Sequence, residues 1–143
     1  MKFSTLFIAI SAFSATTFAA PPANCGATDD TNPMVYRNST FSNENPKAGQ
    51  QTCLSVTGLV KSAIKDGSIK LSHYEGPIQV DKLTKLCESN LCPVKPGVQT
   101  FQSCYDVPAD AEAGENINLK IEGITIDKSQ IFCASGKVTV TGK

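Results

Sequence analysis

Apolar and polar residues alternate along most of the chain after residue 24, and this period of two limits the possible folds more than any other feature. Leu54, Val56 and Val60 share one parity, with Ser55 and Thr57 between them. Similar runs follow at residues 68–72, 101–107, 117–122 and 137–141. No run has the period of an amphipathic helix, so each predicts a half-buried strand with one dry face.

Turn-forming residues separate these runs at intervals of roughly ten to fifteen residues. They lie at Asn45–Gly49, Asp66-Gly67, Glu75–Pro77, Pro96-Gly97, Pro108–Gly114 and Ser135-Gly136. This punctuation predicts an all-β fold, an immunoglobulin-like antiparallel β-sandwich of about seven strands. Only residues 84–90 have room for a single helical turn.

The amino terminus has the composition of a secretory signal peptide. Lys2 precedes the apolar stretch Phe3–Phe13, and the small residues of Thr17–Ala19 fit a cleavage site at their end. We therefore expect a signal peptide at residues 1–19 and one domain at residues 20–143. The mature chain would be secreted or delivered to the lumen of a vacuole or endosome.

Six cysteines follow this leader, and an oxidising compartment makes disulfides their default state. Six cysteines allow fifteen pairings, so strand parity must choose among them. Cys53 and Cys104 both point away from the apolar faces of their strands, and antiparallel pairing of those strands would set them opposite each other. Cys87 and Cys92 are close enough in sequence to close a small loop. The remaining pair, Cys25 and Cys133, would tie the amino-terminal arm to the last strand. The predicted disulfides are Cys25–Cys133, Cys53–Cys104 and Cys87–Cys92.

The composition argues against several function classes. The 13 basic and 13 acidic residues give no net charge and no basic run, so no nucleic-acid partner and only transient membrane contact are expected. The spacing of Cys87 and Cys92 is not CxxC, and one histidine leaves few ligands, so no metal site is expected. A hydrolase would have only Ser72 and His73, whose side chains point to opposite faces of a strand. We therefore expect no enzyme, no catalytic residue and no cofactor. The sequon at Asn38 predicts surface glycosylation.

Short motifs recur in a recognisable order across residues 24–141. They are Asn24-Cys25-Gly26, Gly49-Gln50, Asp66-Gly67 with residues 68–74, Leu86-Cys87, Cys92-Pro93-Val94, Pro96-Gly97, Asp106-Val107-Pro108, Ala113-Gly114, Gln130–Cys133 and Lys137-Val138. Their order and spacing resemble the ML lipid-recognition family, which includes the soluble Niemann-Pick type C sterol carrier and fungal phosphatidylglycerol/phosphatidylinositol transfer proteins. Two features depart from the animal sterol carrier: the bridge between Cys53 and Cys104 looks added, and Ala109, Ala111 and Ala113 stand where that carrier has bulkier residues.

The resemblance implies two sheets that stand apart, so that a lipid lies in an apolar cavity between them. By strand parity, the lining candidates are Val56, Ile69, Leu71, Phe101, Tyr105, Ile117, Leu119, Ile121, Phe132 and Val138. The implied function is a non-enzymatic carrier that binds a sterol or phospholipid and transfers it between membranes, with the loops at Gly76-Pro77 and 108–115 at the mouth. The alternative is a secreted adhesion or effector module, whose apolar stripes fill a closed core and whose partner is a protein.

Overall fold

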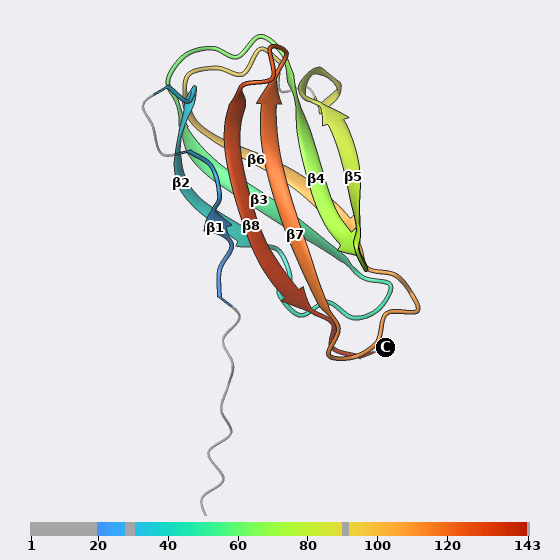
Figure 1. Cartoon of the computed structure of the whole chain (residues 1–143). Helices are drawn as coiled ribbons and strands as arrows, with labels where there is room; N and C mark the ends of the chain where they lie inside the picture. The colour runs from blue at the N-terminus through green and yellow to red at the C-terminus, as the bar shows by residue number, and fades with distance from the viewer. Residues whose placement is uncertain (1–19, 28–30, 90–91, 143) are drawn as a thin grey trace, which may run out of the picture.

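The computed structural model describes residues 20–27, 31–89 and 92–142, and the predicted signal peptide lies outside these residues. Two antiparallel sheets pack face to face and form a β-sandwich, which confirms the predicted fold class (Figure 1). Among the described residues, no helix is long and apolar enough to cross a membrane.

The two sheets differ in width. The five-stranded sheet has the order β1 (Ala23–Asn24), β8 (Gln130–Thr139), β7 (Asn116–Thr125), β4 (Gly67–Glu75) and β5 (Ile78–Lys85). The three-stranded sheet has the order β2 (Met34–Phe41), β3 (Gln51–Val60) and β6 (Gly97–Asp106). A 3-10 turn, η1 (Leu86–Ser89), follows β5, at the place where the sequence predicts one helical turn.

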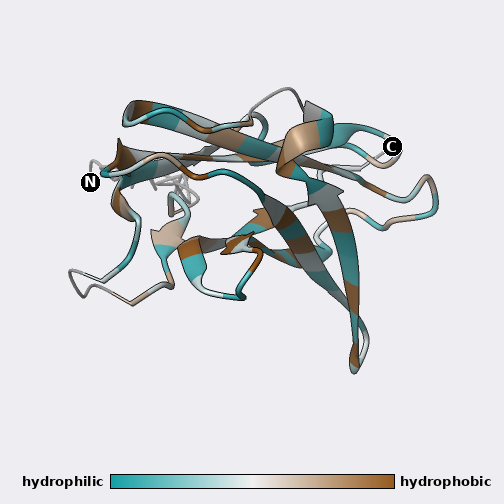
Figure 2. Ribbon diagram, turned by 90° about the horizontal axis from the view of Figure 1, so that it is seen from above, coloured by the Kyte–Doolittle hydropathy of each residue, from teal (hydrophilic) through white to brown (hydrophobic). Residues whose placement is uncertain are grey.

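The inner faces of both sheets form the hydrophobic core. Along β3, every second residue from Thr52 to Val60 is buried, because that face meets the other sheet. Figure 2 shows the corresponding hydrophobic and hydrophilic bands along the strands of both layers. Phe101 of β6 meets Phe132 of β8 with ring centroids 5.0 Å apart, so aromatic packing joins the two sheets. Gly123 of β7 makes room for this contact, because a Cβ at that position would collide with the Phe132 ring.

All six cysteines form the three predicted disulfides, and none is free. Cys53 and Cys104 are directly opposite each other in the register of β3 and β6, as strand parity predicts. The bond from Cys25 fastens the segment after β1 to Cys133 of β8, so it lies within the five-stranded sheet. The third bond joins Cys87 of η1 to Cys92, five residues further along the chain.

The sequon residue Asn38 is exposed on β2, and its glycosylation stays a prediction.

Candidate functional site

A pocket of about 260 Å³ opens between the two sheets, where β4 and β5 face β6. We call it the inter-sheet pocket, and it is lined by Leu71, His73, Glu75, Lys82, Cys104, Tyr105, Asp106 and Pro108. It arises because the three-stranded sheet ends at β6 while the five-stranded sheet continues to β5. The part of β5 that extends beyond this edge is poorly covered, and Ile78 remains 64% exposed there.

Two rings from opposite sheets meet at this pocket. His73 of β4 and Tyr105 of β6 have ring centroids 4.6 Å apart and planes tilted by 54°. His73 has the same strand parity as Leu71, which turns its ring inward although it lies near the end of β4. Its Nε2 lies 3.1 Å from Oε1 of Glu75. The rings therefore close one wall of the pocket with groups that can also make hydrogen bonds.

The pocket has both polar and apolar walls. Lys82 of β5 donates a hydrogen bond from Nζ to the carbonyl oxygen of Cys104 at 3.4 Å, which links the two sheets across the opening. Burial raises the pKa of Tyr105, and the carboxylates of Glu75 and Glu115 raise it further. Tyr105 is therefore a neutral phenol at physiological pH, able to donate or accept a hydrogen bond.

The structure places the ten predicted lining residues in two groups. Leu71 and Tyr105 line the inter-sheet pocket. The other eight are buried in the core, and they are Val56, Ile69, Phe101, Ile117, Leu119, Ile121, Phe132 and Val138. All eight belong to the core between the sheets, where Phe101 and Phe132 already touch. A lining role for these eight residues remains a prediction that requires the sheets to move apart.

Sequence reasoning missed four polar residues that line the pocket, His73, Glu75, Lys82 and Asp106. Parity could have found His73, which lies two residues after Leu71 on the same strand. In the sequence, this histidine stands out only as half of a serine–histidine pair. Ser72 and His73 do point to opposite faces of β4, and they line different pockets.

One group of metal-ligating residue types occurs within the described part of the chain, namely Asp66, Cys87 and Cys92. Both of its cysteines are joined in a disulfide. Zinc binding by cysteine requires thiolates, so this cluster offers only one carboxylate for a metal ion.

No protein-family model and no curated protein sequence matches this chain. Solved structures do match it. A Niemann-Pick type C2 protein from the Japanese carpenter ant has a TM-score of 0.61 at 13% identity, over 84% of this chain and 98% of the ant protein. Chicken MD-1, complexed with lipid IVa, has a TM-score of 0.53 at 11% identity, over 82% of this chain and 86% of MD-1. The C-terminal domain of wzt has a TM-score of 0.61 at 11% identity, over 87% of this chain and 81% of that domain. The chain therefore shares its β-sandwich fold with a Niemann-Pick type C2 protein and with MD-1.

Proposed function

We propose that this chain is a non-enzymatic lipid carrier of the ML type, which binds a sterol or phospholipid between its sheets and transfers it between membranes. The observation that carries the proposal is the inter-sheet pocket, because it opens at the edge of an interface built from apolar side chains. Two findings support it: the motif order resembles the ML family, and the fold is shared with MD-1, whose structure contains lipid IVa.

The size of the pocket indicates how a lipid would bind. Ligand pockets for small molecules usually measure about 300–1,000 Å³, and this one measures about 260 Å³. A whole lipid therefore fits only after the sheets separate and the contact between Phe101 and Phe132 opens. The apolar side chains would then exchange contacts with each other for contacts with the lipid, and each Å² of lipid surface removed from water contributes about 25 cal/mol.

The polar residues of the pocket give the bound lipid an orientation. The apolar part would extend into the core, while His73, Tyr105 and Lys82 remain at the opening. Their hydrogen-bonding groups suit a sterol hydroxyl or a phospholipid headgroup. This arrangement needs no bond-making step, and the separation of Ser72 from His73 leaves that pair without the contact that nucleophilic catalysis requires. The three disulfides fit a secreted or lumenal location.

Lipid uptake by the delipidated chain tests the proposal directly. The chain is titrated with dehydroergosterol and, separately, with a fluorescent phosphatidylinositol, and saturable binding of at least one is expected. Failure of both titrations overturns the proposal and favours the adhesion or effector module with a filled core.

A cross-link across the pocket tests whether the sheets must separate. His73→Cys with Tyr105→Cys adds two thiols from opposite sheets, and all native cysteines are already in disulfides. Closing this pair with a short bifunctional thiol reagent should abolish uptake, whereas the same variant without reagent should still bind, more weakly because both polar side chains are gone. The matched control is Thr57→Cys with Thr100→Cys, a directly opposed pair within the three-stranded sheet, where cross-linking should leave uptake unchanged. Equal uptake by both cross-linked proteins would show that binding does not use this opening.

A further inference from the structure

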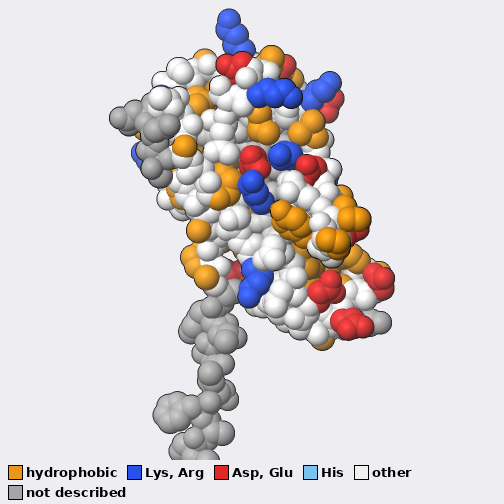
Figure 3. Space-filling view, in the orientation of Figure 1, with side chains coloured by type: hydrophobic (Ala, Val, Ile, Leu, Met, Phe, Trp, Pro, Cys, Tyr) orange, Lys and Arg blue, Asp and Glu red, His pale blue; other side chains and the backbone are white. Residues whose placement is uncertain are grey.

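A second hollow, which we call the outer groove, lies on the face of the five-stranded sheet that points away from the core. It has a volume of about 380 Å³ and crosses four strands, β5, β4, β7 and β8. Its lining includes Ser72, Tyr74, Gln79, Asn118, Lys120 and Lys137. Figure 3 views the molecule from this side and shows basic, acidic and hydrophobic side chains close together on the surface.

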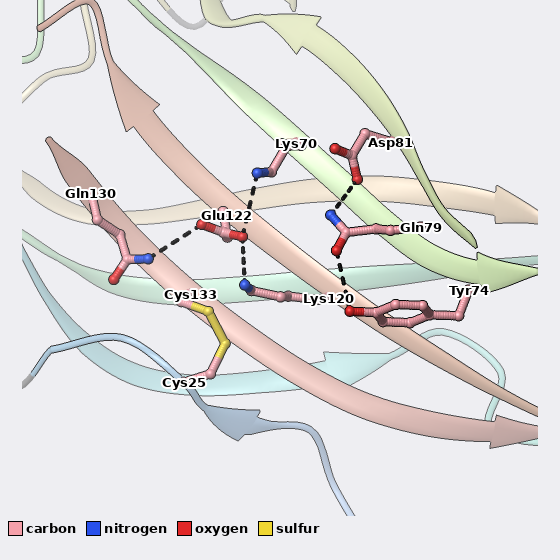
Figure 4. A network of polar contacts seen from close by, with 9 residues as sticks. All are labelled: Cys25, Lys70, Tyr74, Gln79, Asp81, Lys120, Glu122, Gln130 and Cys133. Carbon is pink, nitrogen blue, oxygen red and sulfur yellow. Dashed lines mark hydrogen bonds and ion pairs between the residues drawn. A yellow bond between two sulfur atoms is a disulfide. The ribbon is translucent and has the colours of Figure 1, made fainter. Parts of the chain in front are cut away.

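The groove exists because small side chains lie among long ones. Ser72 of β4 pairs in register with Lys120 of β7, which in turn pairs with Ser135 of β8. The side chain of Lys120 turns toward Glu122 and ends 2.7 Å from Oε1 of that residue (Figure 4). The two serines therefore form a floor, and Tyr74 and Lys137 stand beside it.

The floor carries a polar atom without a partner. Ser72 is 2% exposed, and its Oγ completes no hydrogen bond among the described residues. Asp81 of β5 lies opposite Ser72 in the register of the two strands. The Gln79 amide lowers the pKa of the Asp81 carboxyl group most, and the nearby Ser72 hydroxyl lowers it further. No hydrogen bond between the side chains of Ser72 and Asp81 is completed in the structure. A buried hydroxyl in this state is destabilising unless a ligand or water satisfies it.

One wall of the groove is an aromatic ring held in place. Tyr74 is 58% exposed, and its hydroxyl donates to Oε1 of Gln79 at 3.2 Å. Gln79 in turn donates from Nε2 to Oδ1 of Asp81 at 2.8 Å (Figure 4). This chain of hydrogen bonds fixes the ring while leaving it open to solvent, which suits it to contact the apolar face of a ligand.

Two carboxylates, those of Glu122 and Asp81, lie among the lysines around the groove and disfavour a strongly anionic ligand. Glu122 binds Lys120 at 2.7 Å and Lys70 at 3.7 Å, so these cations are already compensated. Burial alone would raise the pKa of Glu122, but the hydrogen bond from Lys120 and both lysine charges outweigh it and lower the pKa. Asp81 adds a second carboxylate on the other side, near Ser72. An anion on the serine floor would therefore lie close to a negative charge.

We propose that the outer groove binds the ring of a neutral saccharide. A sugar ring has an apolar face for Tyr74 and hydroxyl groups that can hydrogen-bond with Ser72 and with the amide of Asn118. The site lies on the opposite face of β4 from the inter-sheet pocket, so the proposal is independent of lipid binding.

The test is a titration of the isotope-labelled mature chain with mannotriose, cellotriose, maltotriose and chitotriose, followed by NMR of the backbone amides. At least one trisaccharide should produce saturable shifts at Ser72, Tyr74 and Asn118. Tyr74→Ala should weaken that binding about tenfold, whereas Tyr74→Phe, which keeps the ring, should stay within about threefold. The lipid uptake of Tyr74→Ala should match that of the unaltered chain, which separates this test from that of the carrier function.

Ser72→Ala separates a binding role from a structural one. Removing an unpartnered hydroxyl should leave the free energy of unfolding unchanged or increased, while saccharide binding weakens about three- to tenfold. Leu83→Ser, an exposed position of β5 outside the groove, is the matched control and should bind normally. The proposal is overturned if no trisaccharide shifts these amides, if Tyr74→Ala binds as well as the unaltered chain, or if inorganic phosphate alone produces saturable shifts there.

Discussion

Removing the disulfides one at a time should destabilise the fold in an order set by the length of chain that each one closes. The sequence separations are 108 residues for Cys25–Cys133, 51 for Cys53–Cys104 and 5 for Cys87–Cys92. In the chain-entropy description, a cross-link stabilises a protein by restricting its unfolded state. The corresponding losses in the free energy of unfolding are about 5, 4 and 2 kcal/mol at 25 °C. The pairing of β1 with β8 should survive removal of the Cys25–Cys133 bond, because Ala23 and Asn24 pair with β8 through the backbone.

Alanine is the suitable replacement for both members of each pair. Cys133 is only 1% exposed, and serine there would bury an additional hydroxyl group. Urea unfolding followed by circular dichroism gives the free energy of each variant, provided that the slope with urea is compared as well. A loss for Cys87–Cys92 equal to or greater than that for Cys25–Cys133 would refute the loop-length reasoning.

Three further predictions concern single side chains. Phe132→Ala should lower the free energy of unfolding by about 3–5 kcal/mol in the same urea assay, because it leaves a cavity beside Phe101, and a loss under about 1 kcal/mol would mean that the core refills this space. The pKa of Glu122 is lowered in the folded state, so the stability that its carboxylate gives the fold is complete above the ordinary pKa of 4.5 and is lost as the pH falls through the folded-state pKa. Glu122→Gln, which also loses the pairing with Lys120, should flatten this part of the curve of unfolding free energy against pH. The pKa of Tyr105 is raised, so the stability that its neutral phenol gives the fold is complete up to the ordinary pKa of 10.0 and is lost as the pH rises through the raised pKa. Absorbance titration should show one phenol that ionises above pH 10.0, and this transition should be absent in Tyr105→Phe.

Alternation in the sequence predicts strands well where one face is covered by the other sheet, as in β3, β4, β6 and β7. It fails for β5, because this edge strand extends beyond the three-stranded sheet and exposes Ile78 and Leu83 on opposite faces. In β2, an irregularity between Tyr36 and Asn38 shifts the parity of the buried positions, so a fixed period of two does not describe it.

The sites were harder to predict than the fold. The predicted lining residues do lie between the sheets, as strand parity indicates. Parity carries no information, however, on the distance between the two sheets. The inter-sheet pocket depends on the unequal widths of the sheets, which no local pattern encodes. The outer groove depends on Ser72 and Ser135 becoming neighbours of the same lysine across three strands, and only the sheet order brings them together.

The placement of the sulfur bridges has a mechanical consequence. Two of them each act within a single layer of the sandwich, and the third closes a local loop. The layers are therefore held to each other by the backbone connections and by non-covalent packing. Under the proposed carrier function, widening the interior would therefore require no thiol exchange, because no disulfide joins one layer to the other, and each layer would keep its own cross-link as the sheets separate.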